Sequence, residues 1–259
     1  MVFRAPASGT QAVSGTKTPA APGFGTSAAP GTGMLPALPA LRELLPRGAL
    51  ARGSVLAVPE FGLLCLALAA GASAAGAWCS IAGIPEAGLL AAAGLGLDIE
   101  RMLLVPDPGP AWPQVVASLL DGCELVLVRP PAMAQAPVRR RLEAALRRAG
   151  GVLLVAGDWP GAQVRLQVLT QRWTGLGHGH GRVRACCAEV TADGRGEAAL
   201  ARTRWLWLPA EDGAVAVADP VDIPVTNTPF PQDIPVARDS FAGDPFAAPA
   251  AGLRAVTAY

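Results

Sequence analysis

The stretch GSVLAVPEFGLLCLALAAGASAAGAWCS, residues Gly53–Ser80, decides the fold of this chain. Its pattern predicts a buried strand at Ser54–Val58, a tight turn at Pro59–Gly62, an apolar helix at Leu63–Ala74 and a second strand at Ala77–Ile81. A strand, a glycine-containing turn and a helix at the head of an α/β chain are the frame in which a phosphate-binding loop is found.

The residues that would bind phosphate are missing from that frame. A working phosphate-binding loop needs a lysine just after its last glycine, whereas Gly62 is followed by Leu63 and Leu64. The single lysine of the chain, Lys17, lies in a low-complexity N-terminal segment. We therefore expect a degenerate nucleotide site whose backbone amides attract an anion only weakly, formed by Pro59, Glu60, Phe61, Gly62, Leu63 and Leu64.

The amino-acid composition indicates a globular protein and excludes some classes of nucleic-acid-binding protein. The 259 residues are 51% hydrophobic and 16% charged, enough for one sizeable core with flanking tails. The net charge of +1 excludes a protein that coats nucleic acid by charge alone. The five cysteines are odd in number and have no CxxC spacing, which indicates reduced thiols and a cytoplasmic location. They are Cys65, Cys79, Cys123, Cys186 and Cys187.

Neither of two segments that could direct the chain to a membrane has the expected pattern. The N-terminus has no continuous apolar stretch after Arg4, so no signal peptide is expected. The uncharged run Phe61–Pro85 is long enough to suggest a membrane span, but Ser73, Gly76 and Ser80 interrupt it. A buried helix followed by a strand is the preferred interpretation, and no membrane partner is expected.

Strands and helices alternate through the middle of the chain, which predicts a mostly parallel sheet with right-handed crossovers. The expected helices are Leu38–Leu45, Glu86–Gly94, Trp112–Asp121 and Val138–Ala149, and the further expected strands are Met102–Val105, Glu124–Val128 and Gly151–Ala156. After Gln163, the segments VRLQVLTQRW, GRVRACCAEVTA and RTRWLWLP alternate polar and apolar residues. This alternation predicts an antiparallel meander at one edge of the sheet.

The two ends of the chain differ in composition from the middle. We expect a disordered segment at residues 1–33, one α/β domain at 34–209 and a Pro-rich, acidic, disordered tail at 210–259. The tail repeats Asp-Ile-Pro-Val, which suggests short docking segments for a partner protein. Its candidate partner-binding residues are Phe230, Ile234, Phe241 and Phe246.

The predicted helix Val138–Ala149 has an arginine-rich outer face. Glu143 is the only acid among these arginines, so the face stays strongly positive. One interpretation is a solvated helix face, and the other is a surface that contacts phosphates or a partner. The candidate DNA-binding residues are Arg139, Arg140, Arg141, Arg147 and Arg148, which Arg129, Arg165 and Arg172 would extend.

Other chemistry-bearing residues have structural interpretations. His178 and His180 lie in a glycine-rich stretch, so a hairpin turn is expected there and no metal site. Asp158 has no base or nucleophile near it in sequence, and we expect a turn or helix cap. Four tryptophans are expected to pack on the sheet rather than to stack on bases: Trp159, Trp173, Trp205 and Trp207.

The order of these segments resembles the actinobacterial branch of the ImuA family, a RecA-related group from a damage-inducible mutagenesis cassette. The resemblance covers about residues 34–209 and is strongest in the DWPGA and WTGLG turns. It rests on LRELLPRGALARGSV, LALAAGASAAGAWCSIAGIPEAGL, LLVPDPGPAWPQVVASLLDG, LVLVRPP, LLVAGDWPGAQVRL and RWTGLGHGHGRVR.

The resemblance implies a RecA-like fold and a non-catalytic accessory protein of error-prone translesion DNA synthesis in the SOS response. The implied partners are an ImuB-like inactive Y-family polymerase homologue and an error-prone DNA polymerase, with DNA as a further contact and no cofactor. The ATPase residues of RecA do not carry over. The phosphate-binding lysine falls within Leu63–Cys65, the catalytic glutamate near Ile84 with Glu86 two residues away, and the magnesium ligand on Arg129.

Other functions remain open at this point. One is an ATP-dependent RecA-like repair or recombination enzyme, although the missing lysine and short segments after Val128 and Ala156 disfavour ATP use and filament formation. Another is an SOS-linked cell-division inhibitor of the SulA type.

Overall fold

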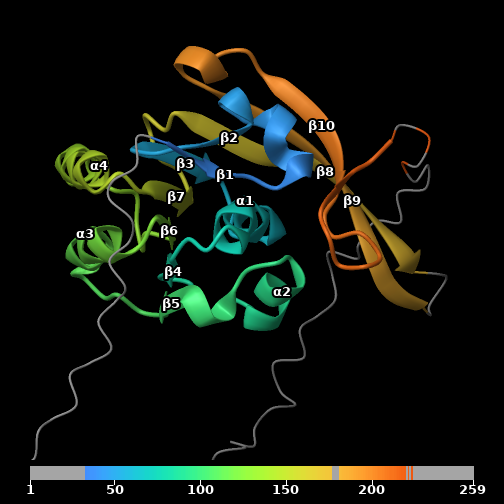
Figure 1. The fold of residues 1–259 in the computed structure, drawn as a ribbon, viewed down its shortest axis with the longest axis horizontal. Helices are drawn as coiled ribbons and strands as arrows, with labels where there is room; N and C mark the ends of the chain where they lie inside the picture. The colour runs from blue at the N-terminus through green and yellow to red at the C-terminus, as the bar shows by residue number, and fades with distance from the viewer. Residues whose placement is uncertain (1–32, 177–180, 220, 222, 224–259) are drawn as a thin grey trace, which may run out of the picture.

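A nine-stranded sheet forms the centre of the protein. The computed structural model describes residues 33–176, 181–219, 221 and 223. The strand order is β11-β10-β9-β8-β3-β7-β6-β4-β5 (Figure 1). The strands of the parallel half are β3 (Ser54–Val58), β4 (Cys79–Ala82), β5 (Met102–Val105), β6 (Leu125–Val128) and β7 (Val152–Ala156). The expected α/β class with a mostly parallel sheet is confirmed.

The central strands are covered on both faces, as their continuous apolar sequences predict. Every residue of β3, β6 and β7 is buried. Helix α1 (Leu63–Ala74) packs on one face, and helices α3 (Trp112–Gly122) and α4 (Ala136–Ala149) pack on the other (Figure 1). Adjacent residues of one strand therefore belong to different cores: Leu154 lies on the α1 side and Leu153 on the α3–α4 side.

Helix α1 is almost uniformly apolar because it lies between the sheet and an N-terminal hairpin. The hairpin pairs β1 (Met34–Pro36) with β2 (Ala49–Ala51). A Cβ on Gly71 would lie only 2.5 Å from the backbone carbon of Ala37, so glycine is needed for this close approach. The run Phe61–Pro85 is thus divided between α1 and β4, and among the described residues no helix has the length and apolarity to cross a membrane.

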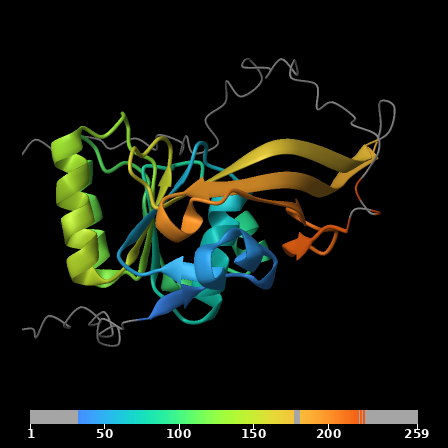
Figure 2. The ribbon, with the colours of Figure 1, turned by 90° about the horizontal axis from the view of Figure 1, so that it is seen from above.

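An antiparallel arm extends the sheet from β3 to one side (Figure 2). It consists of β8 (Val164–Leu176), β9 (Gly181–Gly194), β10 (Arg202–Trp207) and β11 (Ala216–Val217). Strand β8 pairs in parallel with β3 and antiparallel with β9, so it joins the two halves of the sheet. The expected meander at one edge is confirmed.

The structure differs from the sequence-based expectations at several boundaries. The helix expected at Leu38–Leu45 is the 3₁₀ helix η1 (Pro39–Leu44), which ends because Leu45, the residue before Pro46, is extended; a second 3₁₀ turn, η2 (Pro46–Gly48), follows. The helix expected from Glu86 is α2 (Leu89–Gly94), which starts only after Gly88. Two further 3₁₀ turns are η3 (Ile99–Arg101) and η4 (Gly196–Ala198).

The C-terminal boundary of the fold is also later than expected. Strand β11 pairs with β10, and the backbone N–H of Ala218 donates to the carbonyl of Trp205 at 2.9 Å. The segment expected as a tail from Ala210 therefore begins with residues that belong to the sheet. The expected disordered segments fall largely on residues 1–32 and 224–259, outside the described residues.

Candidate functional site

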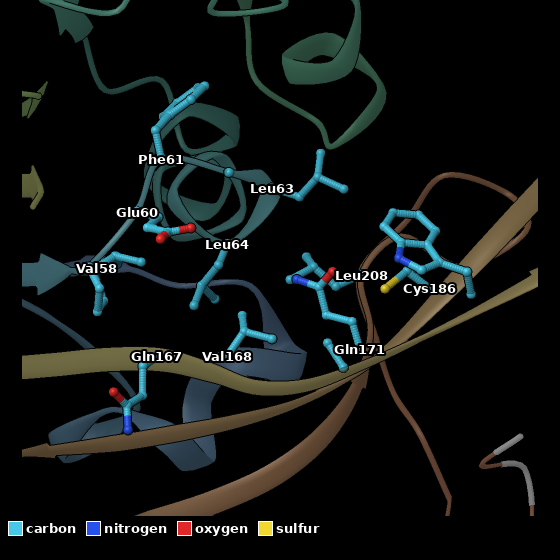
Figure 3. Close-up of a pocket in the computed structure, with 14 residues that line it drawn as sticks. Val58, Glu60, Phe61, Leu63, Leu64, Gln167, Val168, Gln171, Cys186 and Leu208 are labelled. Carbon is cyan, nitrogen blue, oxygen red and sulfur yellow. The ribbon is translucent and has the colours of Figure 1, made fainter. Parts of the chain in front are cut away.

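A cavity of about 500 Å³ lies over the first strand–turn–helix crossover (Figure 3). One wall is the turn after β3 and the start of α1, and the other comes from β8, β9 and Leu208, the residue after β10. All six residues of the expected degenerate nucleotide site line it: Pro59, Glu60, Phe61, Gly62, Leu63 and Leu64. The structure thus brings these residues together as one surface.

The leucines after Gly62 serve packing. Leu64 is 3% exposed and belongs to the α1-side core, while Leu63 is partly buried against the same core. Gly62 is the N-cap of α1 and offers no side chain to the first amides of the helix. The charged residue in the cavity lining is Glu60, which would repel a phosphate. The cavity therefore retains the shape of a crossover pocket but lacks the charge that a nucleotide requires.

The far wall of the cavity was not anticipated from the sequence. In Figure 3, Gln171 extends into the cavity, whereas Gln167 points away from it below β8. Cys186 and Leu208 close the same side. These residues follow the crossover by more than a hundred positions, and only the parallel pairing of β8 with β3 brings them there.

Glu86, the acid two residues from the expected catalytic position Ile84, binds Arg129, which occupies the expected position of the magnesium ligand. Arg129, directly after β6, forms a bidentate ion pair with Glu86, with 2.9 Å between Nη2 and Oε2, and its Nε donates to the carbonyl of Gly83 at 3.2 Å. The hydrogen bond from Arg129 lowers the pKa of Glu86, and the same bond raises the pKa of Arg129. Arg129 lines a different cavity with the Pro106–Pro110 loop, so these groups do not face the crossover cavity.

The loops after the two central strands are short, as expected. Only residues 129–135 connect β6 to α4, and residues 157–163 connect β7 to β8. In the second loop, Asp158 forms an ion pair with Arg165 at 3.6 Å. Asp158 lies in this loop just before a turn at Pro160–Gly161, and the next element is β8, so there is no helix for it to cap. This arrangement leaves the carboxyl edge of the parallel strands without an acid–base pair suited to catalysis among the residues described.

Helix α4 presents most of its arginines to solvent. Arg140, Arg141, Arg147 and Arg148 are exposed, whereas Arg139 is half-buried and donates to the carbonyl of Ala134. Glu143 turns away from them and accepts a hydrogen bond from Trp159 Nε1 at 3.2 Å. Arg148 approaches Asp121 of α3 at 3.9 Å. The positive surface therefore consists of four arginines, and Arg139 does not belong to it.

The three arginines that were expected to extend this positive surface do not lie together. Arg165 and Arg172 lie on β8, whose register puts both on the sheet face that carries α3 and α4. Arg129, however, is held by Glu86 at the end of β6. Arg165 is paired with Asp158, so the extension adds little net charge.

The tryptophans occupy three environments. Trp159 is fully buried under α4, and Trp173 packs partly against the α1-side core and lines the crossover cavity. Trp205 and Trp207 lie on β10 and are half-buried. The guanidinium of Arg172 lies 5.1 Å from the centroid of the Trp205 ring.

The cysteines are buried and free. Burial raises the pKa of Cys65 to about 11 and those of Cys79 and Cys186 to about 12. These thiols therefore stay protonated and unreactive at neutral pH. Within the part of the chain that is described, no three His, Cys, Asp or Glu residues gather as metal ligands. The expected hairpin turn at His178 and His180 and the candidate docking residues Phe230, Ile234, Phe241 and Phe246 lie outside it.

The sequence similarity of this chain to known proteins lies mainly in the parallel half of the sheet. A family model described as the MT3502 N-terminal domain matches residues 43–161. The uncharacterised protein Rv3395c of Mycobacterium tuberculosis is 38% identical over 128 residues, which cover 48% of this chain and 63% of that relative. The family match includes the turn Pro59–Gly62, the Arg129–Glu86 pair and α4, and it ends before β8 begins.

Proposed function

We propose that this protein is a non-catalytic, RecA-like accessory protein of error-prone translesion DNA synthesis, related to the ImuA family. It works in the cytoplasm as an adaptor between DNA and a polymerase-like partner. The partners are an ImuB-like inactive Y-family polymerase homologue and an error-prone DNA polymerase. The similarity to a mycobacterial protein supports an actinobacterial relative within that family.

The non-catalytic role rests on how three residues at or near the nucleotide-handling positions are placed. Leu64 belongs to the core, Glu60 places a negative charge in the crossover cavity, and Arg129 neutralises Glu86. Phosphoryl transfer relies almost entirely on cations and positioned donors around the phosphates. A scaffold that lacks them acts through its surfaces, and the exposed arginines of α4 are the surface that we assign to DNA.

Nucleotide binding tests the non-catalytic role directly. Titration of the full chain with ATP and Mg²⁺ by calorimetry should give no magnesium-dependent heat at millimolar nucleotide. Hydrolysis of ATP by protein free of contaminating ATPases would contradict the proposal and favour a RecA-like enzyme. Filamentation of cells that express the chain without DNA damage would instead favour a division inhibitor.

Partner binding tests the adaptor role. The tagged chain, purified from cells after DNA damage, should retain the Y-family-like homologue, and a chain that lacks residues 224–259 should lose it. Deletion from residue 224 is the appropriate variant, because deletion from Ala210 would remove β11 and expose the edge of β10. A matched chain that lacks residues 1–32 serves as the control. Equal retention by both deletions would exclude the C-terminal tail as the docking segment.

A further inference from the structure

The antiparallel arm leaves one sheet face without a described covering element. Helix α4 packs on this face over the parallel half, and β8, β9 and β10 continue beyond it (Figure 2). The register places Arg172, Cys187 and Trp207 side by side across this face. The next row holds Thr170, Glu189 and Trp205. The opposite face of the same strands belongs to the α1-side core.

Aromatic and apolar side chains are concentrated at the middle of this face. Trp205 and Trp207 are half-buried, and the guanidinium of Arg172 lies over the Trp205 ring. On β8, two strands away, a bulge between Val168 and Thr170 includes Leu169, which is 53% exposed. Cys187, between Arg172 and Trp207, is small and fully buried, so the larger side chains stand above it. Clustered apolar side chains on an open sheet face indicate a binding surface.

The charges on this face argue against nucleic acid as the ligand. Arg165 and Arg172 face outward together with Glu189 and Asp193, and Arg165 is already paired with Asp158. The face therefore has no excess of positive charge, which binding to phosphates requires. Two tryptophans with one arginine are better suited to a proline-rich peptide, because proline rings pack on indoles and the polyproline conformation costs little entropy.

We propose that this face binds the Pro-rich C-terminal segment of the same chain, residues Phe230–Val236 (FPQDIPV). The chain leaves the described structure beside it, because Ala216 is the register partner of Trp207 and the N–H of Ala218 bonds to the Trp205 carbonyl. Phe230 follows Ile223, the last residue described, by seven positions. At about 3.3 Å per extended residue, this linker reaches roughly 23 Å, enough to fold back over β10.

Charge sets the orientation of the segment. In the proposed contact, its single charged residue, Asp233, approaches the Arg172 guanidinium that lies over Trp205, whereas Glu189 on the neighbouring row repels a carboxylate. Pro231 and Pro235 then flank the tryptophans. A short tether raises the local concentration of the segment to the millimolar range, so an intrinsically weak contact is populated within one chain. This inference does not depend on the proposed role in DNA synthesis.

Photo-crosslinking in the full chain tests the contact. With Phe230→p-benzoylphenylalanine, irradiation of dilute protein should give crosslinks within one chain, mapped by mass spectrometry to β8 and β10. Replacing Trp205 and Trp207 with threonine, a good strand former, should reduce the crosslink yield about tenfold. The matched control is Trp173→Thr, which removes an indole from the opposite face of the arm and should leave the yield unchanged. Circular dichroism and melting temperatures establish that the variants are folded.

Several results would overturn the proposal. These are crosslinks to the crossover cavity, crosslinks only between two chains, and an equal loss of yield in the Trp173 control. Failure to crosslink at any described surface would do the same. If the double variant does not fold, Asp233→Lys in the tail leaves the domain untouched and should still lower the yield several-fold.

Discussion

The parallel half and the antiparallel arm of this protein use their surfaces in opposite ways. The carboxyl edge of the parallel strands is where α/β proteins usually bind ligands. Here Leu64 packs into the core and Arg129 forms an ion pair with Glu86. In the arm, the outer sheet face keeps Trp205 and Trp207 half-buried with no described element above them.

This difference suggests where the protein does its work. At this edge Arg129 is paired with Glu86 and the crossover cavity is lined by Glu60, so its strands mainly provide a rigid core. The arm and the outer side of α4 carry the groups that remain available for binding. We therefore expect mutations in the parallel half to change stability and mutations on the arm or α4 to change binding.

Removal of a core side chain from the parallel half should have the largest effect. Leu154 on β7 is 1% exposed, and Leu154→Ala should cost about 2–5 kcal/mol of unfolding free energy because it leaves a cavity. The matched substitution Leu169→Ala, in the arm at 53% exposure, should change stability by less than about 0.5 kcal/mol. Urea denaturation measures both, and similar losses would mean that the arm is packed as tightly as the parallel half.

Loss of the Glu124 carboxylate should have the next largest effect. Its Oε1 accepts from Arg52 at 2.9 Å and its Oε2 from the backbone of Trp78 at 3.1 Å, so it joins the starts of β3, β4 and β6. Glu124→Ala should cost about 1–3 kcal/mol, because Arg52 is left partly buried without its partner. Glu197→Ala, which removes the exposed partner of Arg47, should have no measurable effect in the same thermal melts.

The arginines of α4 should affect binding rather than stability. If they contact DNA, changing Arg140, Arg147 and Arg148 to alanine should weaken binding and reduce the salt slope by up to about 3, roughly one for each phosphate contact. Anisotropy titrations of labelled DNA at several salt concentrations measure this slope. A control in which Arg42, Arg182 and Arg184 become alanine removes the same charge elsewhere. Unchanged binding in the α4 variant would exclude this helix as the DNA-contacting surface.

The Arg129–Glu86 pair should produce the smallest effect, visible only in its pH dependence. The pKa of Glu86 is lowered in the folded protein, so its stabilising contribution is present above the unfolded-state pKa and disappears as pH falls through the lowered folded-state pKa. Glu86→Gln should therefore lower the melting temperature slightly at pH 7, and the difference should shrink as the pH falls below the ordinary pKa of a glutamate, about 4.3, and vanish below the lowered folded-state pKa. A difference that persists in acid would mean that Glu86 stabilises the protein without its charge.

Most elements of the parallel half could be predicted from the sequence because each is specified locally. The apolar runs of β3 and β7 and the αL glycine at Gly150 follow directly from residue type and order. The helix expected at Leu38–Leu45 could not be predicted correctly, since its leucines are buried in 3₁₀ turns as well as they would be in an α-helix. The missing phosphate ligands were also evident, because an absent lysine needs no tertiary information.

The residues that complete the crossover cavity and the outer face of the arm could not be predicted from the sequence. The sequence by itself determined the α/β class, the order of the elements and the lack of a lysine after Gly62, because these depend on neighbours along the chain. Only the tertiary structure decided that Gln171 faces the crossover, that Arg129 holds Glu86 and that Arg172 lies over Trp205. Each of these contacts joins residues that are distant in sequence, and strand pairing and register set the distance between them.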